Sequence, residues 1–309
     1  KDKDFPFFFS NSPLCSFRAF GGALVHDSTG NKKSLHIGIN YLDLPEGKGR
    51  LNGCFNDVET LQGIIVDKYG FSPDNARVLR DDQPDQMPTR ANIEEGIAWL
   101  VDGASSGDSL VFQFSGHGGQ VHDRDGDEED GKDETLIPCD FRENGMICDD
   151  DLFEQLVGPL PPGVMLTIIM DCCHSGTGMD LAFIHKVNQD EEEQSFSGFL
   201  QKNNPNEENA NQSDIAQQSQ KKYDDTSDAV VVMFSGCMDN QTSADATING
   251  KASGAMTYSL STALDSTGGN CSYRELLLKM YELLEEGGYT QVPQLSTACP
   301  FDLDSQFTL

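Results

Sequence analysis

Residues 166–176 read Leu-Thr-Ile-Ile-Met-Asp-Cys-Cys-His-Ser-Gly, and they decide how the rest of the chain is interpreted. The first five residues are mostly β-favouring and apolar, which is typical of a strand buried in a sheet. Small and polar residues follow at once and cannot continue that strand. We therefore expect Cys172 and Cys173 at the rim of a sheet, where open α/β folds place their sites.

A second stretch of the same kind lies upstream, where residues 111–119 read Val-Phe-Gln-Phe-Ser-Gly-His-Gly-Gly. It predicts another buried strand, which ends at His117 between glycines. Two parallel strands that end side by side would bring His117 to a cysteine, as a thiol–imidazole pair requires. Because successive strand residues face opposite sides, only one of Cys172 and Cys173 can meet His117, and the spacing leaves the choice open.

Other interpretations compete with a catalytic pair. His117 could be a core histidine with satisfied hydrogen bonds, and a free cysteine is often a small buried hydrophobe. A zinc site at Cys172, Cys173 and His174 is disfavoured, because adjacent residues rarely reach one tetrahedral centre. A redox pair of Cys172 and Cys173 is also disfavoured, since vicinal cysteines close only a strained ring and the chain has no Cys-x-x-Cys motif.

Short apolar runs alternate with amphipathic segments along the rest of the chain, which predicts βαβ units. We expect an α/β fold with a central, mostly parallel sheet of about six to eight strands. The expected strands lie at 34–40, 76–79, about 107–115, 164–170, 229–234 and 294–296, and the expected helices at about 52–68, after Thr89, at 254–265 and at 272–286.

The chain divides into four parts by composition. Residues 1–33 predict an irregular N-terminal arm, and residues 34–185 a large catalytic block. Residues 186–228 are polar and acidic with few aliphatics, which predicts a flexible linker. Residues 229–309 predict a small block that shares the same sheet.

The formal net charge of −30 restricts the partners of this protein. It argues against nucleic acid, whose phosphates require a basic surface, and against anionic membranes. It favours cationic partners, which are metal ions or substrates that carry Lys or Arg. A merely solvated acidic surface is the alternative.

The nine cysteines are odd in number and scattered, unlike a secreted disulfide framework. We therefore expect a cytoplasmic protein, in which Cys139 and Cys148 flank a short turn and could pair under oxidation. No apolar run approaches the roughly 18 residues of a membrane span.

Several segments together resemble the metacaspases, the caspase-like cysteine peptidases of plants, fungi, algae and protists. Ser-Gly-His-Gly at 115–118 and Asp-Cys-Cys-His-Ser-Gly at 171–176 are similar to the two catalytic signatures of that family. The resemblance covers nearly the whole chain from about residue 34, and it includes the segments 52–57, 235–237, 241–245 and 292–296. It implies a caspase-like α/β/α sandwich in the type I order and a monomer.

The same resemblance implies roles for the two signatures. Cys173 corresponds to the nucleophile, which would cleave after Arg or Lys through a thioester acyl-enzyme. His117 would act first as base and then as acid. Backbone N–H groups near Gly118 and Cys173 would stabilise the oxyanion.

A pocket for a basic side chain requires fixed carboxylates, and the sequence offers two. Asp171 lies two positions before Cys173 and therefore on the same face of the strand. Asp57 lies at the start of the first helix, where an acid is also favoured by the helix dipole alone. Together with Cys54 and Ser115, these two residues are the expected substrate pocket.

The resemblance also implies a calcium site formed by Asp133, Asp149, Asp150 and Asp180. An EF-hand in the acidic run before Asp133 is excluded, because Glu128 stands where that loop needs glycine. Asp149 and Asp150 also begin an expected helix, where acids are favoured without any metal.

These expectations together predict a calcium-dependent cysteine endopeptidase that acts on peptides and proteins with Arg or Lys at the cleavage site. Lysines in or near the linker make self-cleavage a further hypothesis, and the candidate positions are Lys186, Lys202, Lys221 and Lys222. The alternative is a catalytically silent, calcium-responsive scaffold.

Overall fold

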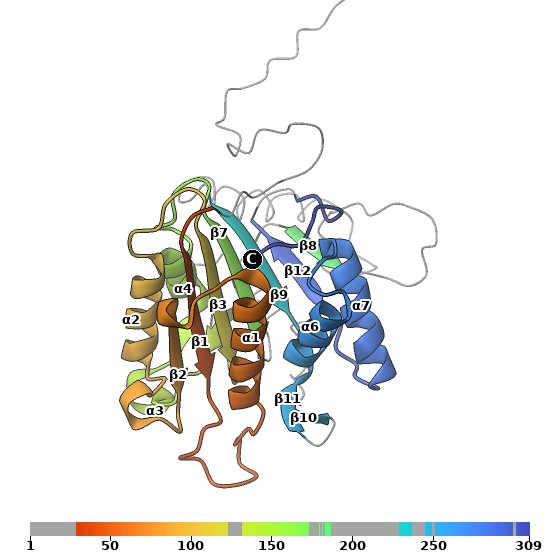
Figure 1. Ribbon diagram of the computed structural model, residues 1–309. Coiled ribbons are helices and arrows are strands. Elements are labelled where there is room, and N and C mark those ends of the chain that lie inside the picture. The colour runs from red at the N-terminus through yellow and green to blue at the C-terminus, as the bar shows by residue number, and fades with distance from the viewer. Residues whose placement is uncertain are drawn as a thin grey trace, which may run out of the picture.

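The computed structural model describes residues 29–122, 132–172, 179, 181, 183–186, 229–236, 245–248, 251–298 and 301–309. Its centre is a seven-stranded sheet with helices on both faces (Figure 1). The expected linker from residue 187 onward and the arm up to residue 28 lie outside the described residues.

The main sheet has the order β2-β1-β3-β7-β9-β12-β8. Its strands are β1 (Lys32–Gly38), β2 (Ala76–Arg80), β3 (Ser109–Ser115), β7 (Met165–Asp171), β8 (Phe183–Lys186), β9 (Val230–Ser235) and β12 (Gln294–Thr297). The first five strands in that order run parallel, whereas β12 is antiparallel to both β9 and β8. The expected mostly parallel sheet of about six to eight strands is confirmed.

Helices α2 (Arg90–Val101) and α4 (Asp149–Leu156) cover one face of the sheet. Helices α1 (Cys54–Tyr69), α6 (Ala255–Ser266) and α7 (Tyr273–Glu286) cover the other face. Alternate residues of each central strand feed one core or the other, as the pleat requires. This arrangement is the α/β/α sandwich that the sequence predicts.

The Thr89 cap forms as the sequence predicts, and two further capping signals define helix ends. Thr89 caps α2, because its hydroxyl oxygen accepts a hydrogen bond from the Asn92 N–H at 3.2 Å. Helix α1 ends at Gly70, whose φ of 70° is left-handed and favours glycine. Ser272 and Glu275 form a capping box at the start of α7.

Several small elements have no clear sequence signal. A second sheet pairs β4 (Gly118–His122), β5 (Lys132–Leu136) and β6 (Ile147–Cys148), and a two-stranded hairpin pairs β10 (Asp245–Ile248) with β11 (Lys251–Gly254). The short helix α3 (Phe141–Asn144) and the 3₁₀ turns Pro73–Asn75 and Pro84–Gln86 complete the elements. Short polar strands show no alternation of apolar and polar residues, so their formation depends on pairing with other strands in the folded protein.

Within the described ranges, none of the helices has both the length and the apolarity that crossing a membrane requires.

Candidate active site

His117 lies between the end of β3 and the start of β4. Its backbone N–H donates to the Tyr41 hydroxyl oxygen at 2.8 Å, and the two rings lie with centroids 4.6 Å apart. The ring nitrogen Nε2 is 2.7 Å from the carbonyl oxygen of Gly49. Because a carbonyl only accepts, Nε2 carries the proton in this contact. Neutral His117 therefore has Nδ1 as the ring atom that can accept a proton.

Tyr41 holds this arrangement, although sequence reasoning missed it. The buried Tyr41 hydroxyl donates to the Ile137 carbonyl oxygen at 2.7 Å while it accepts from His117. Its φ of 55° is uncommon for a residue other than glycine. The only sequence signal is a tyrosine three positions after β1, just where the chain leaves the sheet.

Two other histidines have the surroundings of structural residues. His36 is buried in β1 with Nδ1 2.7 Å from Gln113 Oε1, and His185 is buried in β8. Burial lowers the pKa of each to about 4, so both are neutral at physiological pH. His117, in contrast, is half-buried at the end of a strand.

The two strands that carry the signatures are parallel neighbours, as the sequence predicts. Ser115 of β3 pairs in register with Asp171 of β7. Cys172 is 2 % exposed and packs in the core beneath α2 and α4. Cys173 and its backbone N–H lie outside the described residues, so the dyad stays a prediction. Gly118 begins β4 directly after His117.

The expected pocket residues Asp57 and Asp171 lie close together inside the protein, on the face covered by α1 and α6. The Asp57 carboxylate accepts from the Ser253 hydroxyl at 2.6 Å and from the Gly254 N–H at 3.0 and 3.1 Å. Asp171 Oδ2 accepts from the Thr257 N–H at 2.8 Å, in the first turn of α6. Sequence reasoning missed all three donors.

This carboxylate pair is electrostatically unusual. Burial, and next the negative charge of Asp171, raise the pKa of Asp57 to about 8. The hydrogen bonds from Ser253 and Gly254 oppose this rise but do not cancel it. The pair therefore retains a proton at neutral pH. A pair of buried carboxyls with a raised pKa at the end of a sheet is typical of a functional site.

The other two expected pocket residues are also buried. Ser115 is 1 % exposed at the end of β3, on the same face as Asp171. Cys54 is a buried thiol outside any disulfide, three positions before Asp57 on α1, and its N–H donates to Asn40 Oδ1 at 3.2 Å. The fold therefore brings the four expected residues to one region.

The expected metal ligands lie on β5 and at the start of α4. Asp133 is buried in β5, and Asp149 and Asp150 are the first residues of α4. Asp149 accepts from the Glu134 N–H at 3.2 Å and from the Asp150 N–H at 3.0 Å. β5 pairs with β6 at Thr135 and Cys148, and α4 begins directly after Cys148.

Carboxylate oxygens are the ligands that calcium prefers, so the chemistry of this donor set fits the ion. Within the part of the chain that the structure describes, however, no three His, Cys, Asp or Glu side chains are grouped as metal ligands. Asp180 lies outside those residues. The calcium site therefore stays a prediction.

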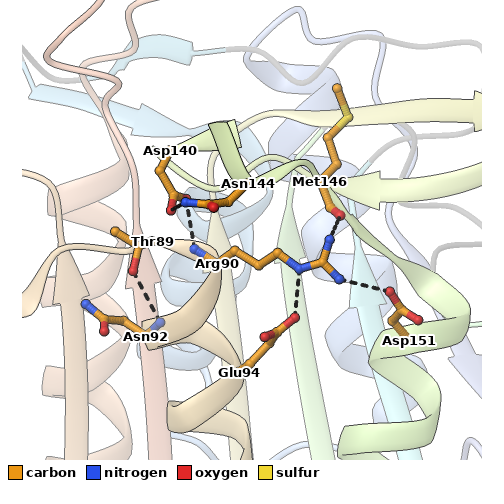
Figure 2. A network of polar contacts seen from close by, with 8 residues as sticks. All are labelled: Thr89, Arg90, Asn92, Glu94, Asp140, Asn144, Met146 and Asp151. Atoms are coloured by element: carbon orange, nitrogen blue, oxygen red, sulfur yellow. Dashed lines mark hydrogen bonds and ion pairs between the residues drawn. The ribbon is translucent and has the colours of Figure 1, made fainter. Parts of the chain in front are cut away.

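Arg90 fixes the start of α4 against α2 (Figure 2). Its guanidinium donates to Glu94 Oε1 at 2.8 Å, to the Met146 carbonyl oxygen at 2.7 Å and to Asp151 Oδ2 at 3.2 Å. Its backbone N–H donates to Asp140 Oδ1 at 2.8 Å. These contacts position the helix that begins with the expected metal ligands. Sequence reasoning did not single out Arg90.

Neither Cys139 nor Cys148 forms a disulfide in the structure. Burial and the neighbouring Asp140 charge raise the pKa of the Cys139 thiol to about 12, which makes it a poor nucleophile.

Comparison with known proteins identifies the family. Residues 32–182 match the family model "Metacaspase, peptidase C14 domain". Metacaspase-1 of Eremothecium gossypii is 41% identical, with 91% of this chain and 67% of that protein covered. Metacaspase-1 of Yarrowia lipolytica is 39% identical, with 97% and 69% covered.

A solved protein from Geobacter sulfurreducens has a similar fold, with a TM-score of 0.59 at 24% identity over 90% of this chain and 98% of that one. The matched family segment contains β1, α1, β3 and β7, and with them the strand end at His117 and the acidic pair. With the curated relatives covering most of the chain, the sandwich is the caspase-like fold, and this chain belongs to the metacaspase family of cysteine peptidases.

Proposed function

We propose that this protein is a calcium-dependent cysteine endopeptidase that cleaves after Arg or Lys. The observation that carries the specificity is the buried pair Asp57 and Asp171, which lies at the end of the strand preceding Cys173. Family membership supports the peptidase chemistry. The positions of His117 and of the acidic pair on neighbouring strand ends support the roles given below.

The proposed reaction starts at His117. Its Nδ1 accepts the Cys173 thiol proton, because Nε2 is engaged with the Gly49 carbonyl. The thiolate attacks the substrate carbonyl carbon, and N–H groups near Gly118 and Cys173 stabilise the oxyanion. The imidazolium then protonates the leaving amine, and a thioester forms. Water hydrolyses the thioester, with His117 again accepting a proton.

The acidic pair supports a preference for basic side chains. A guanidinium or ammonium group would supply positive charge where two carboxylates lie close together. Its arrival would favour release of the proton that Asp57 retains, since the raised pKa results from burial and from the Asp171 charge. An acidic side chain at this place would instead add a third buried carboxylate.

The calcium requirement is part of the same proposal. Asp133, Asp149 and Asp150 would hold the ion together with Asp180. The bound ion would supply positive charge that draws β5, α4 and the segment after Cys173 together. Arg90 supports this role because its contacts keep the start of α4 in place.

Hydrolysis of matched fluorogenic peptides that end in Arg, Lys or Asp tests the proposal, each with calcium and with chelator. We expect cleavage of the Arg and Lys peptides only with calcium, and none by Cys173→Ala or His117→Ala. Cleavage of the Asp peptide would overturn the assigned pocket. A protein that cleaves none of the peptides but is stabilised by calcium would be a calcium-responsive scaffold.

Self-cleavage at Lys186, Lys202, Lys221 or Lys222 belongs to the proposal as well. Intact-mass analysis after incubation with calcium would show cleavage after these positions in the active protein but not in Cys173→Ala. An unchanged mass in protein that cleaves the Arg peptide would exclude self-processing.

A further inference from the structure

The acidic pair does not face open space. Ser253 and Gly254, at the end of β11, lie against it, and we call these two residues the Ser253–Gly254 corner. The Ser253 hydroxyl is 2.6 Å from Asp57 Oδ1, and the Gly254 N–H donates to both Asp57 oxygens. The corner is 196 positions away from Asp57 in the sequence.

The corner fills the space beside both carboxylates. A Cβ atom added at Gly254 would lie 2.0 Å from Asp171 Oδ2 and 2.3 Å from its Cγ, so only glycine fits here. Asp57 is 1 % exposed and Asp171 is 4 % exposed. A basic side chain therefore cannot contact the two carboxylates while the corner is in place.

The corner also imitates what a basic side chain would offer. It presents an N–H and an O–H to one carboxylate, which is the donor pattern of a guanidinium. These donors are neutral, however, and offset only part of the effect of burial and of the Asp171 charge on the pKa of Asp57. A cation at the same place would stabilise the negative charge of both carboxylates. Exchange of the corner for a cation is therefore favourable when the other contacts of the bound peptide offset the cost of desolvating that cation.

The corner connects the β10–β11 hairpin to α6, because Gly254 is the N-cap residue of that helix. In the described ranges, β11 pairs with β10 in a two-stranded hairpin outside the main sheet. The hairpin also contacts α1 through the Asn56 side-chain amide, which donates to the Ala252 carbonyl oxygen at 2.7 Å. Helix α6, in contrast, packs in the core through Met256 and Leu260 and keeps its Thr257 N–H on Asp171.

We propose that the Ser253–Gly254 corner occupies the position of the substrate's basic group in the free protein, and that an Arg or Lys side chain must displace it from Asp57. This inference rests on the proposed preference for basic side chains. It assigns Ser253 as a residue that sets the affinity for such substrates, because its hydroxyl competes with them for Asp57 Oδ1.

The test compares Ser253→Ala with the wild type in the whole 309-residue chain. We expect the Kd of an Arg-ended tetrapeptide amide, measured on the Cys173→Ala background, to fall about three- to tenfold when the competing hydroxyl is removed. In active protein, KM should fall by a similar factor at unchanged kcat. Ser261→Ala is the matched control, since Ser261 lies on α6 and donates to the Tyr258 carbonyl oxygen instead.

Hydrogen exchange at residues 252–257 provides the second measurement. On binding of the same peptide, we expect the Gly254 amide to exchange faster and the Thr257 amide to remain protected. Tighter binding to Ser253→Ala together with faster Gly254 exchange supports the proposal. An unchanged or raised Kd in Ser253→Ala would overturn the proposed displacement of the corner, and so would an unchanged exchange rate of the Gly254 amide in the wild-type complex. Either result would leave the proposed preference for basic side chains intact. No binding of Arg or Lys peptides to either protein would overturn the proposed specificity itself.

Discussion

Asp57 and Asp171 are buried carboxylates that accept from donors in a distant part of the chain, whereas Asp149 and Asp150 begin α4. Ser253, Gly254 and Thr257 supply the donors of the first pair. In the second group, Asp149 accepts from the backbone N–H groups of Glu134 on β5 and of Asp150, at a helix N-terminus that favours negative charge. Both groups consist of the same residue type, yet their surroundings differ.

The different surroundings of the two groups indicate which cation each could bind. Burial, and next the Asp171 charge, raise the pKa of Asp57, so a cation that arrived with a substrate would stabilise the ionised pair. The second group is held in place by the fold itself, including the Arg90 contacts before and within α4. It therefore suits an ion that needs several oxygens at fixed positions.

The strongest way to break this comparison is Asp57→Asn. We expect kcat/KM for the Arg peptide to fall at least about 100-fold, because breaking a buried charge pair costs about 3–5 kcal/mol. The free protein should not lose stability above neutral pH, since the change removes a like-charge repulsion. Asp67→Asn, on an exposed position of the same helix, is the matched control for activity and thermal unfolding. Retained Arg cleavage in Asp57→Asn would show that the pair does not bind the substrate.

A smaller effect is expected at the second group. Asp149→Asn should weaken calcium binding about tenfold or more and reduce the calcium-induced rise in Tm, because the ion loses one charged ligand. Calorimetric titration and thermal unfolding with calcium or chelator would measure both. Glu154→Gln is the control, since Glu154 is exposed on the same helix and is not an expected ligand. Equal calcium responses in both variants would remove Asp149 from the site.

The smallest expected effect is the pH dependence of substrate binding, which distinguishes the pair of Asp57 and Asp171 from the group at the start of α4. The raised pKa of Asp57 means that the folded pair binds a proton that is lost as the pH rises toward and through about 8. Between pH 6.5 and 8.5, the Kd of the Arg peptide should fall about three- to tenfold, because the deprotonated pair carries more negative charge.

The free energy of unfolding changes in the opposite direction: it falls as the pH rises, whereas substrate binding becomes tighter. The folded pKa of Asp57 lies above its unfolded value, so this group contributes less stability as the pH rises through that window. Urea unfolding should show this fall in the free energy of unfolding with rising pH in the wild type and in Asp149→Asn, but not in Asp57→Asn. A pH-independent Kd in the wild type would mean that the pair is already fully ionised.

Much of the fold follows from local patterns. The apolar runs that end at Ser115 and at Asp171 predict neighbouring parallel strands, which the register confirms. Thr89 and the stripe of α1 predict helices that form where expected. The small sheet of β4, β5 and β6 was not predictable, because its strands are short and polar and form only through pairing with one another.

The candidate site divides in the same way. Strand ends single out His117 and Asp171, because a strand that stops in polar residues exposes them at a predictable edge. Asp57 is singled out by its residue type and its place at the start of the first helix. Tyr41 and Gly49, which hold His117, carry no periodic signal, since their role depends on where a loop returns to the strand end.

The sequence by itself therefore determined six strands of the main sheet, their alternation with helices along the chain, and the residue types at the strand ends, because these follow from hydrophobic period and residue type over a few positions. Only the tertiary structure decided that Ser253 and Gly254 close the acidic pair and that Asp57 keeps a proton. Those features depend on burial and on contacts between residues almost 200 positions apart, which no local pattern encodes.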